Sequence, residues 1–298
     1  MSITQKPRVI DHLVLPVIDI DVARARYEQL GFTVAPNGTH PFGTENACVF
    51  FNDDTFLEPI AVAHRETCEA AALKGNTFVA NDQAYRFRRG QEGFSHLVIK
   101  TDDASADHKD YVKAAISGGS MVRFSRPFKT LEGKRDKASF KLAFAADRRA
   151  PDAGFFACEV VSAPRVDQTA LKTHANGAQG LLEVVISEPN PSDFQYFLQD
   201  FLDQREMDNN SFGIEFESGN TKVSVLSPDG MRAFYGLEAE KNERGLRLTA
   251  YVIGVVDLAS VEAHLIQQRI AASVFGDKLV VPPSAGQGCT IAFQEVSA

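Results

Sequence analysis

Residues 10–32 read IDHLVLPVIDIDVARARYEQLGF, which is the pattern of a buried strand followed by an amphipathic helix. The stretch begins with an almost continuous apolar run, as buried strands do. Asp19 follows this run, and its side-chain oxygen can accept the unpaired amides of a first helical turn. Ala23, Tyr27 and Leu30 then fall on one face of the helix. The stretch therefore predicts a strand and a helix that packs on it.

The same pattern recurs further along the chain. It is found in FSHLVIKTDDASADHKDYVKAAISGG (94–119), LLEVVISEPNPSDFQYFLQDFL (181–202) and LTAYVIGVVDLASVEAHLIQQRI (248–270). When the residues before each helix are set in register (Asp19, Asp103, Asn190, Asp257), the residues seven places earlier are His12, His96, Glu183 and Ala250. Runs rich in Val, Phe and Ile between the helices are typical of half-buried strands. The chain is therefore predicted to be an α+β protein of four βαβββ modules.

Other segments separate these modules. Residues 64–74 and 78–89 have the pattern of extra helical pieces between the first two modules. A polar connector, VDQTALKTHANGAQG at 166–180, separates the second module from the third. We expect a first domain at 1–166, a linker at 167–179 and a second domain at 180–298.

The composition is that of an ordinary globular protein, since 44% of the 298 residues are hydrophobic and 23% are charged. A net charge of −8 argues against a nucleic-acid partner, because phosphate binding needs a basic surface. The first residues, MSITQKPRVIDH, lack the apolar run of a secretory signal, and no stretch offers the roughly 18 apolar residues of a membrane span. The 4 cysteines lie far apart without a C-x-x-C pair, which predicts reduced thiols. We expect a cytoplasmic protein without a membrane partner.

Several segments, taken in order, resemble the vicinal-oxygen-chelate (VOC) superfamily and, within it, the glyoxalase-like proteins. They are IDHLVLPVIDIDVARARYEQLGF, HPFGTENACVFFNDDTFLEPIAV (40–62), GFSHLVIKTDD (93–103) and FFACEVVSAP (155–164). The resemblance covers most of residues 8–165 and continues more weakly to the C-terminus. It implies that the modules pair into two curled antiparallel sheets of the glyoxalase/bleomycin-resistance/dihydroxybiphenyl-dioxygenase type.

Proteins of that superfamily hold a divalent metal inside the curled sheet, on the first and last strands of each module. Carried over to this sequence, the resemblance makes His12 and His96 the ligands from the first strands. Glu58 and Glu159 would be the ligands from the last strands. The second domain departs from this pattern, with Glu183 and Ala250 on its first strands and Gln294 or Glu295 on a last strand. The resemblance therefore implies that the second domain is a degenerate copy without a metal.

A metal would also meet a physical demand of the first domain. Side chains alternate along a strand, so Glu58 shares an apolar face with Phe56 and Ile60, where an isolated carboxylate is costly. Two imidazoles and two carboxylates suit Zn, Ni, Mn, Co or Fe. Such a site leaves about two positions for a substrate with vicinal oxygens, which favours Lewis-acid lyase or isomerase chemistry. Glu159, in preference to Glu58, is the candidate for the base that removes a proton beside a carbonyl.

Other interpretations stay open. A single histidine on an apolar strand is more often a hydrogen-bonded core residue than a metal ligand. A metal-free protein that sequesters a small molecule would fit the same resemblance. An Fe(II) extradiol-type dioxygenase that uses His12, His96 and one glutamate would fit as well. Whether the chain is an enzyme therefore stays open.

A further group of residues is expected to contact the substrate. The resemblance places His40 and Asn46 at the mouth of the cavity, although HPFGTEN could equally be an ordinary turn. Arg123 or Arg126 could reach an anionic substrate. The expected partner is a small molecule whose identity the sequence does not define, and a homodimer is also open.

Overall fold

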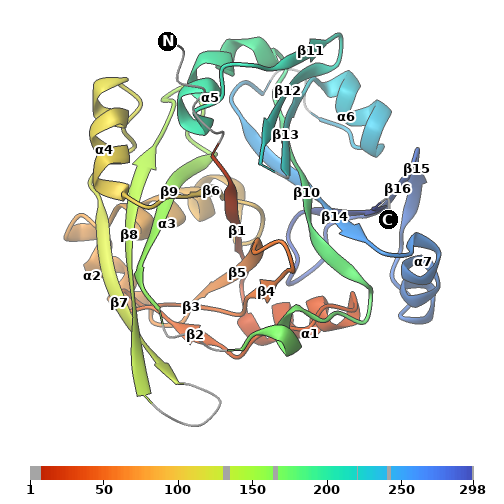
Figure 1. The fold of residues 1–298 in the computed structure, drawn as a ribbon, viewed down its shortest axis with the longest axis horizontal. Helices are drawn as coiled ribbons and strands as arrows, with labels where there is room; N and C mark the ends of the chain where they lie inside the picture. Colours follow the sequence, from red (N-terminus) through yellow and green to blue (C-terminus); the bar gives the residue numbers. More distant parts are fainter. Residues whose placement is uncertain (1–7, 130–134, 164–166, 220, 240–242, 297–298) are drawn as a thin grey trace.

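The computed structural model describes residues 8–129, 135–163, 167–219, 221–239 and 243–296, which form two curled sheets (Figure 1). Sheet A has the strand order β2-β3-β5-β1-β6-β9-β8-β7, with β4 beside β5. Its strands are β1 (Ile10–Pro16), β2 (Gly38–Thr39), β3 (Thr44–Asn46), β4 (Val49–Phe50), β5 (Phe56–Val62), β6 (His96–Lys100), β7 (Val122–Lys129), β8 (Arg135–Ala145) and β9 (Gly154–Ser162). Sheet B has the order β11-β12-β13-β10-β14-β17-β16-β15. Its strands are β10 (Ala178–Ser187), β11 (Asp208–Asn210), β12 (Gly213–Ser218), β13 (Thr221–Leu226), β14 (Arg247–Val255), β15 (Ser273–Phe275), β16 (Lys278–Val281) and β17 (Thr290–Glu295).

The helices lie between and beside these strands. They are α1 (Ile20–Gln29), α2 (Arg65–Leu73), α3 (Thr77–Arg89), α4 (Ala104–Lys113), α5 (Gln195–Leu202), α6 (Pro228–Tyr235) and α7 (Leu258–Gln267), with 3-10 turns η1 (Thr169–Lys172) and η2 (Pro191–Phe194). Helices α2 and α3 are the extra helical pieces that the sequence predicts. Within the described residues, no helix is both long enough and apolar enough to cross a membrane.

The strand pairing follows the predicted modules. In each module the last strand pairs in parallel with the first strand, as β5 does with β1 and β9 with β6. The first strands of two modules pair antiparallel at the centre of each sheet, as β1 does with β6 and β10 with β14. The predicted α+β fold of paired βαβββ modules is confirmed. One detail differs, because the parallel pairs make each sheet mixed rather than wholly antiparallel.

The helix starts explain why the sequence repeat is visible. Asp19, Asp103 and Asp257 each accept hydrogen bonds from two amides of the following first turn, as predicted. Asn190 does not cap in this way. Its side-chain amide instead donates to Asp193, and the 3-10 turn η2 precedes α5, the helix of the third module. The repeat is therefore weakest where the local hydrogen bonding differs.

The connector between the sheets is held by residues of the first module. Its His174 accepts from the amide of Thr33 through Nδ1 at 3.0 Å, and its Nε2 lies 2.9 Å from the carbonyl oxygen of Phe50. Asn176 donates to the carbonyl oxygen of Leu30 at 2.9 Å. The strands of sheet A come from residues 10–162 and those of sheet B from 178–295. We propose that each sheet with its helices is one domain, the second starting close to the expected boundary.

The two sheets share one apolar core, which lies between them. It contains residues of β1 and β6 together with residues of β10, β14 and β17. Tyr27 of α1 and Tyr251 of β14 are fully buried in this core, with their hydroxyl oxygens 3.0 Å apart. The rings of Phe32 and Phe293 stack across it with centroids 5.9 Å apart. The outer faces of both sheets therefore contribute to this core, and their inner, curled faces do not.

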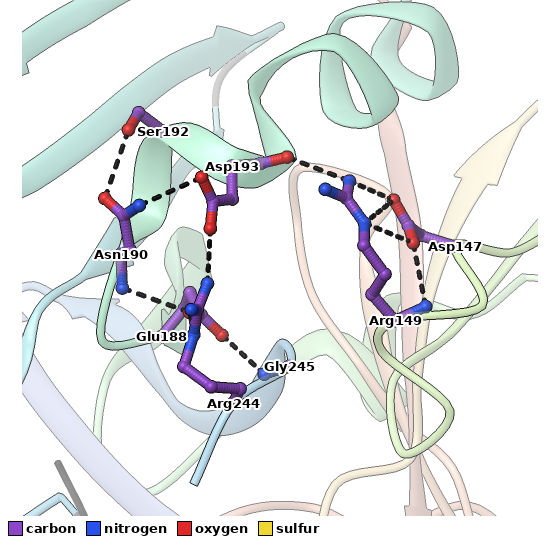
Figure 2. Close-up of polar contacts among 8 residues, drawn as sticks. All are labelled: Asp147, Arg149, Glu188, Asn190, Ser192, Asp193, Arg244 and Gly245. Atoms are coloured by element: carbon purple, nitrogen blue, oxygen red, sulfur yellow. Dashed lines mark hydrogen bonds and ion pairs between the residues drawn. The ribbon is translucent and has the colours of Figure 1, made fainter. Parts of the chain in front are cut away.

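A polar cluster at the end of β10 ties sheet B to sheet A (Figure 2). Glu188 is 0% exposed and accepts from Arg244 Nε at 2.6 Å, from the amide of Gly245 at 2.6 Å and from the amide of Asn190 at 3.0 Å. Arg149, from the loop before β9, donates to the carbonyl oxygen of Asp193 at 2.9 Å. The turn after β10 is thereby held by Arg244 and Gly245 of sheet B's own loop and by Arg149 from the loop before β9.

Candidate functional site

A cavity of about 250 Å³ opens on the inner face of sheet A. Its polar wall comes from β1, β3, β5 and the segment before β3, whereas β7, β8 and β9 supply much of its apolar wall. The corresponding inner face of sheet B is occupied differently, because Met231 and Tyr235 of α6 pack into the apolar cluster there. The cavity of sheet A is therefore the stronger candidate for a binding site.

Glu58 of β5 is the central polar group of this cavity. It pairs with Val14 of β1, and strand alternation turns it to the inner face. Only 7% of Glu58 is exposed. Its carboxylate lies 3.6 Å from Nε2 of His12 and 3.8 Å from Nε2 of His40, and Asn46 Nδ2 donates to it at 2.5 Å. The structure thus brings together four of the predicted site residues.

Both histidines beside Glu58 are held through their other ring nitrogen. Nδ1 of His12 lies 2.6 Å from Asp11 Oδ2, and Nδ1 of His40 lies 2.9 Å from Thr44 Oγ1. Asp11, which the sequence reasoning missed, therefore orients His12. The sequence contains a signal for this contact, because an aspartate directly precedes the histidine on an apolar strand. Burial lowers the pKa of His40 to about 4, so its imidazole is neutral near pH 7.

The remaining wall is made largely of phenylalanine rings, which are Phe42, Phe50, Phe56, Phe78, Phe124, Phe140 and Phe156. Arg126 of β7 also lines the cavity, with Nη1 3.4 Å from Asn46 Oδ1. Arg123 does not reach the cavity. It is exposed, because an odd spacing of three residues turns it to the opposite face of the strand from Arg126. Of the two arginines expected to reach a substrate, the structure therefore places Arg126, and not Arg123, in the cavity wall.

His96 is placed close to the cavity but does not line it. The β1–β6 pairing relates His12 and His96 by an approximate two-fold axis, since His12 pairs with Val98 and Val14 with His96. The ring of His96 lies against Phe78 and Phe156, with centroid distances of 5.8 and 5.6 Å. Its Nδ1 lies 2.8 Å from Ser95 Oγ, and its buried Nε2 has no hydrogen-bond partner. His96 is thus a buried ring that packs against Phe78 and Phe156 beside the cavity.

The expectation for Glu159 needs the largest correction. Glu159 lies on the outer side of β9, where it accepts from Lys141 Nζ at 2.8 Å and from the amide of Ala104 at 3.0 Å. Glu295 in the fourth module does the same at α7, accepting from the amide of Leu258 at 3.0 Å. Both glutamates therefore stabilise the start of a helix, where a negative charge is favourable.

Strand register explains why no second carboxylate enters the cavity. Phe156 pairs with Val98 in the way that Glu58 pairs with Val14, so Phe156 stands at the position of the expected ligand. The resemblance instead implies Glu159 for this position, three residues further along β9.

The expected metal centre is therefore not assembled. Of His12, Glu58, His96 and Glu159, the cavity holds only His12 and Glu58. Throughout the described parts of the chain, no group of three or more His, Cys, Asp or Glu side chains is arranged to hold a metal ion. The side chains as placed do not fit the metal that the resemblance implies.

A metal titration checks this conclusion. After dialysis against a chelator, we expect the protein to take up no stoichiometric Mn(II), Zn(II), Ni(II) or Fe(II) when its metal content is measured by equilibrium dialysis and elemental analysis. One tightly held equivalent in the wild type, lost in both His12→Ala and Glu58→Ala, would show instead that the side chains gather around an ion.

Sheet B has no comparable group at the equivalent positions. Glu183 is buried and accepts from Ser224 Oγ at 2.6 Å, while Lys222 Nζ lies 3.5 Å away. Ala250 is buried in the apolar cluster that contains α6. Gln294 donates to Asp277 at 2.7 Å on an exposed surface. The polar residues of this sheet are thus engaged in local contacts.

The buried histidines of sheet A predict a pH dependence of stability. Burial lowers the pKa of His96 to about 3 and that of His40 to about 4, against roughly 6.5 in an unfolded chain. Between these values the unfolded state binds more protons, so the free energy of unfolding falls as the pH drops from about 6.5 toward 4, by about 1.4 kcal/mol per unit for each histidine. Urea unfolding at pH 7 and pH 5 measures the slope. We expect His96→Gln to reduce it; equal slopes in the wild type and His96→Gln would contradict the assignment.

The fold and this cavity define a protein of the VOC type, with paired βαβββ modules and a polar group on the inner face of one sheet. A family model described as a glyoxalase-like domain matches residues 10–202, and the chain belongs to that family. The match includes the whole of sheet A, the connector and the beginning of sheet B. No curated protein matches the chain in sequence.

Solved structures are similar in fold over nearly the whole chain. A hypothetical protein from Staphylococcus aureus has 13% identity and a TM-score of 0.66, with 96% of this chain and 99% of that chain covered. A mutant 4-hydroxymandelate synthase from Streptomyces coelicolor has 13% identity and a TM-score of 0.56, covering 98% and 93%. The Mn(II)-bound glyoxalase from Novosphingobium aromaticivorans has 10% identity and a TM-score of 0.54, covering 97% and 83%. At these identities the likeness concerns the fold.

Proposed function

We propose that the chain is a lyase or isomerase of the glyoxalase-like type, acting on a small metabolite with vicinal oxygens in the cavity of sheet A. Glu58 would remove a proton from a carbon beside a carbonyl. The observation that carries this proposal is the position of Glu58 in an apolar cavity, between the Nε2 atoms of His12 and His40 at 3.6 and 3.8 Å. Proton transfer by a positioned carboxylate is typical of this reaction class.

The groups around Glu58 support a path for the proton. The contact of Nδ1 with Asp11 would let His12 donate from Nδ1 and present the lone pair of Nε2 to Glu58. The proton taken by Glu58 can then pass to His12, and the carboxylate of Asp11 stabilises the imidazolium that forms. The distance of 3.6 Å is longer than a hydrogen bond, as is common in catalytic pairs before substrate binds.

The other polar groups would hold the substrate. A neutral His40 can donate from Nε2 to a substrate oxygen while the hydroxyl of Thr44 serves its Nδ1. Asn46 fixes the carboxylate of Glu58, and the surrounding rings exclude water, which strengthens each electrostatic contact. No step of the proposal passes through a metal, because the side chains expected to bind one are not gathered in the cavity.

Sequestration of a small molecule is a second candidate function. The observation in its favour is the wall of phenylalanine rings, which provides apolar contact area for a ligand whether or not a reaction follows. An extradiol dioxygenase that uses His12, His96 and one glutamate has less support, since His96 does not line the cavity.

Hydrogen–deuterium exchange separates these functions. Small 2-hydroxy ketones and 2-oxo acids, including dihydroxyacetone and phenylpyruvate, are incubated in D₂O with the protein, and the C–H signal beside the carbonyl is followed by proton NMR. The proposal predicts faster loss of this signal than in buffer. Saturable binding of a compound without accelerated exchange would favour sequestration.

A further inference from the structure

Arg126 is an unusual component of the cavity wall. Among the described residues that line the cavity, it is the only lysine or arginine. Within the described chain its guanidinium makes no ion pair with a carboxylate. Its contacts are the 3.4 Å hydrogen bond to Asn46 Oδ1 and a position over the ring of Phe140, 5.7 Å from the centroid. A half-buried cation in these surroundings favours an anion as its partner.

The space for this guanidinium is provided by the opposite edge of the sheet. A Cβ atom built on Gly38 of β2 would lie 2.1 Å from Arg126 Nη1 and 2.6 Å from Asn46 Oδ1. Any larger residue at position 38 would therefore displace the guanidinium or the amide. The absence of a side chain at Gly38 allows Arg126 to reach across the cavity to Asn46.

Asn46 separates the positive and negative groups of the cavity. Its amide nitrogen donates to Glu58 at 2.5 Å, while its amide oxygen accepts from Arg126. An anionic group bound at Arg126 would thus be one amide away from Glu58. This spacing keeps the bound anion away from the carboxylate of Glu58. The neighbouring atoms of the ligand can still reach Glu58.

The apolar part of the cavity favours a flat ring. Phe124 and Phe140 are stacked with centroids 5.1 Å apart, and Phe42 meets Phe124 edge-on at 5.2 Å. Aromatic rings gain additional energy from such stacked and edge contacts. The volume of about 250 Å³ is below the roughly 300 Å³ at which pockets for drug-sized ligands begin, so the cavity suits one ring.

We propose that the cavity binds a small carboxylate with one aromatic ring, with the carboxylate on Arg126 and the ring among the phenylalanines. This inference deepens the proposed function by naming a substrate class, and it rests on that function only for the reaction at Glu58. Binding itself requires Arg126, Asn46 and the aromatic wall.

Two ligands of the same shape test the inference directly. Isothermal titration of wild-type protein with phenylacetate and with 2-phenylacetamide compares an anion with its neutral analogue. We expect the acid to bind about tenfold to a hundredfold more tightly, the range expected for hydrogen bonds to a charged group. Cyclohexylacetate keeps the charge without the aromatic ring, and we expect it to bind less tightly than phenylacetate.

Variants then assign the preference to Arg126. In Arg126→Met the affinity for phenylacetate should fall to that for 2-phenylacetamide, and the remaining binding of 2-phenylacetamide shows that the cavity is intact. Arg123→Met, on the exposed face of the same strand, is the matched control and should keep the full preference. Gly38→Ala should weaken the preference by displacing the guanidinium.

The outcomes separate this inference from the proposed function. Equal affinities for the acid and the amide in the wild type, no binding of either, or an unchanged preference in Arg126→Met would overturn the ligand class. Glu58→Gln should retain the preference although exchange is lost. If the wild type prefers the acid through Arg126 but exchanges no proton, the ligand class stands and the proposed reaction fails.

Discussion

Glu58→Gln is expected to reduce the rate of substrate proton exchange by about 10² to 10⁴, the usual contribution of a positioned general base. Glutamine has nearly the same shape as glutamate and keeps an oxygen that can accept from Asn46, but it cannot take a proton at neutral pH. The cavity should therefore keep its form and its ligand affinity. The decrease should appear in the rate at saturating substrate, measured by loss of the C–H signal in D₂O.

The control for this variant is Glu159→Gln. Glu159 was the preferred base on sequence grounds, yet it lies on the outer side of β9 in contact with Lys141 and the start of α4. We expect its exchange rate to equal that of the wild type. Loss of activity in Glu159→Gln with full activity in Glu58→Gln would reverse the assignment of the base.

Glu188→Ala is expected to lower the free energy of unfolding by about 3 kcal/mol, because removing a buried charged partner leaves its donors without an acceptor. The carboxylate is 0% exposed and accepts from the side chain of Arg244 and from the amides of Gly245 and Asn190. The amides cannot turn toward water without moving the backbone. Urea unfolding, followed by circular dichroism, measures the loss.

Glu69→Ala provides the comparison for Glu188→Ala. Glu69 pairs with Arg65 on an exposed helix surface, where an ion pair contributes about 0.5 kcal/mol or less. A loss at Glu188 no larger than that at Glu69 would mean that water or a neighbouring acceptor replaces the buried carboxylate.

The modular fold could be predicted because its signals are local. An apolar strand, an aspartate that caps a helix and an amphipathic helix recur in order, and Asp19, Asp103 and Asp257 act as that interpretation requires. The parallel pairing of first and last strands within a module is not local. It depends on contacts between distant segments, which the sequence pattern does not contain.

The candidate site was predicted only in part. His12 and Glu58 could be placed on the inner face because strand alternation and the position of Pro59 fix their surroundings. Glu159 could not be placed, since an error of three residues in register moves a side chain to the opposite face of a strand. Its true partners, Lys141 and the amide of Ala104, become visible only when the strands are paired.

The same limit applies to the arginines of β7. Arg123 and Arg126 have the same chemistry and lie three residues apart, so one of them must face away from the cavity. The sequence does not show which, because that depends on how β7 pairs with β8 and on the room left by Gly38. The space at Gly38 is a property of the assembled sheet.

The apolar layer between the two sheets determines whether the protein can be produced as two separate fragments. A fragment that stops at the connector would carry the residues of the candidate site but would leave the rings of Tyr27 and Phe32 facing solvent, where aggregation would compete with folding. Two fragments produced together could each cover the other's bare surface and restore the protein. The second half would then assist the folding of the first by covering its apolar surface.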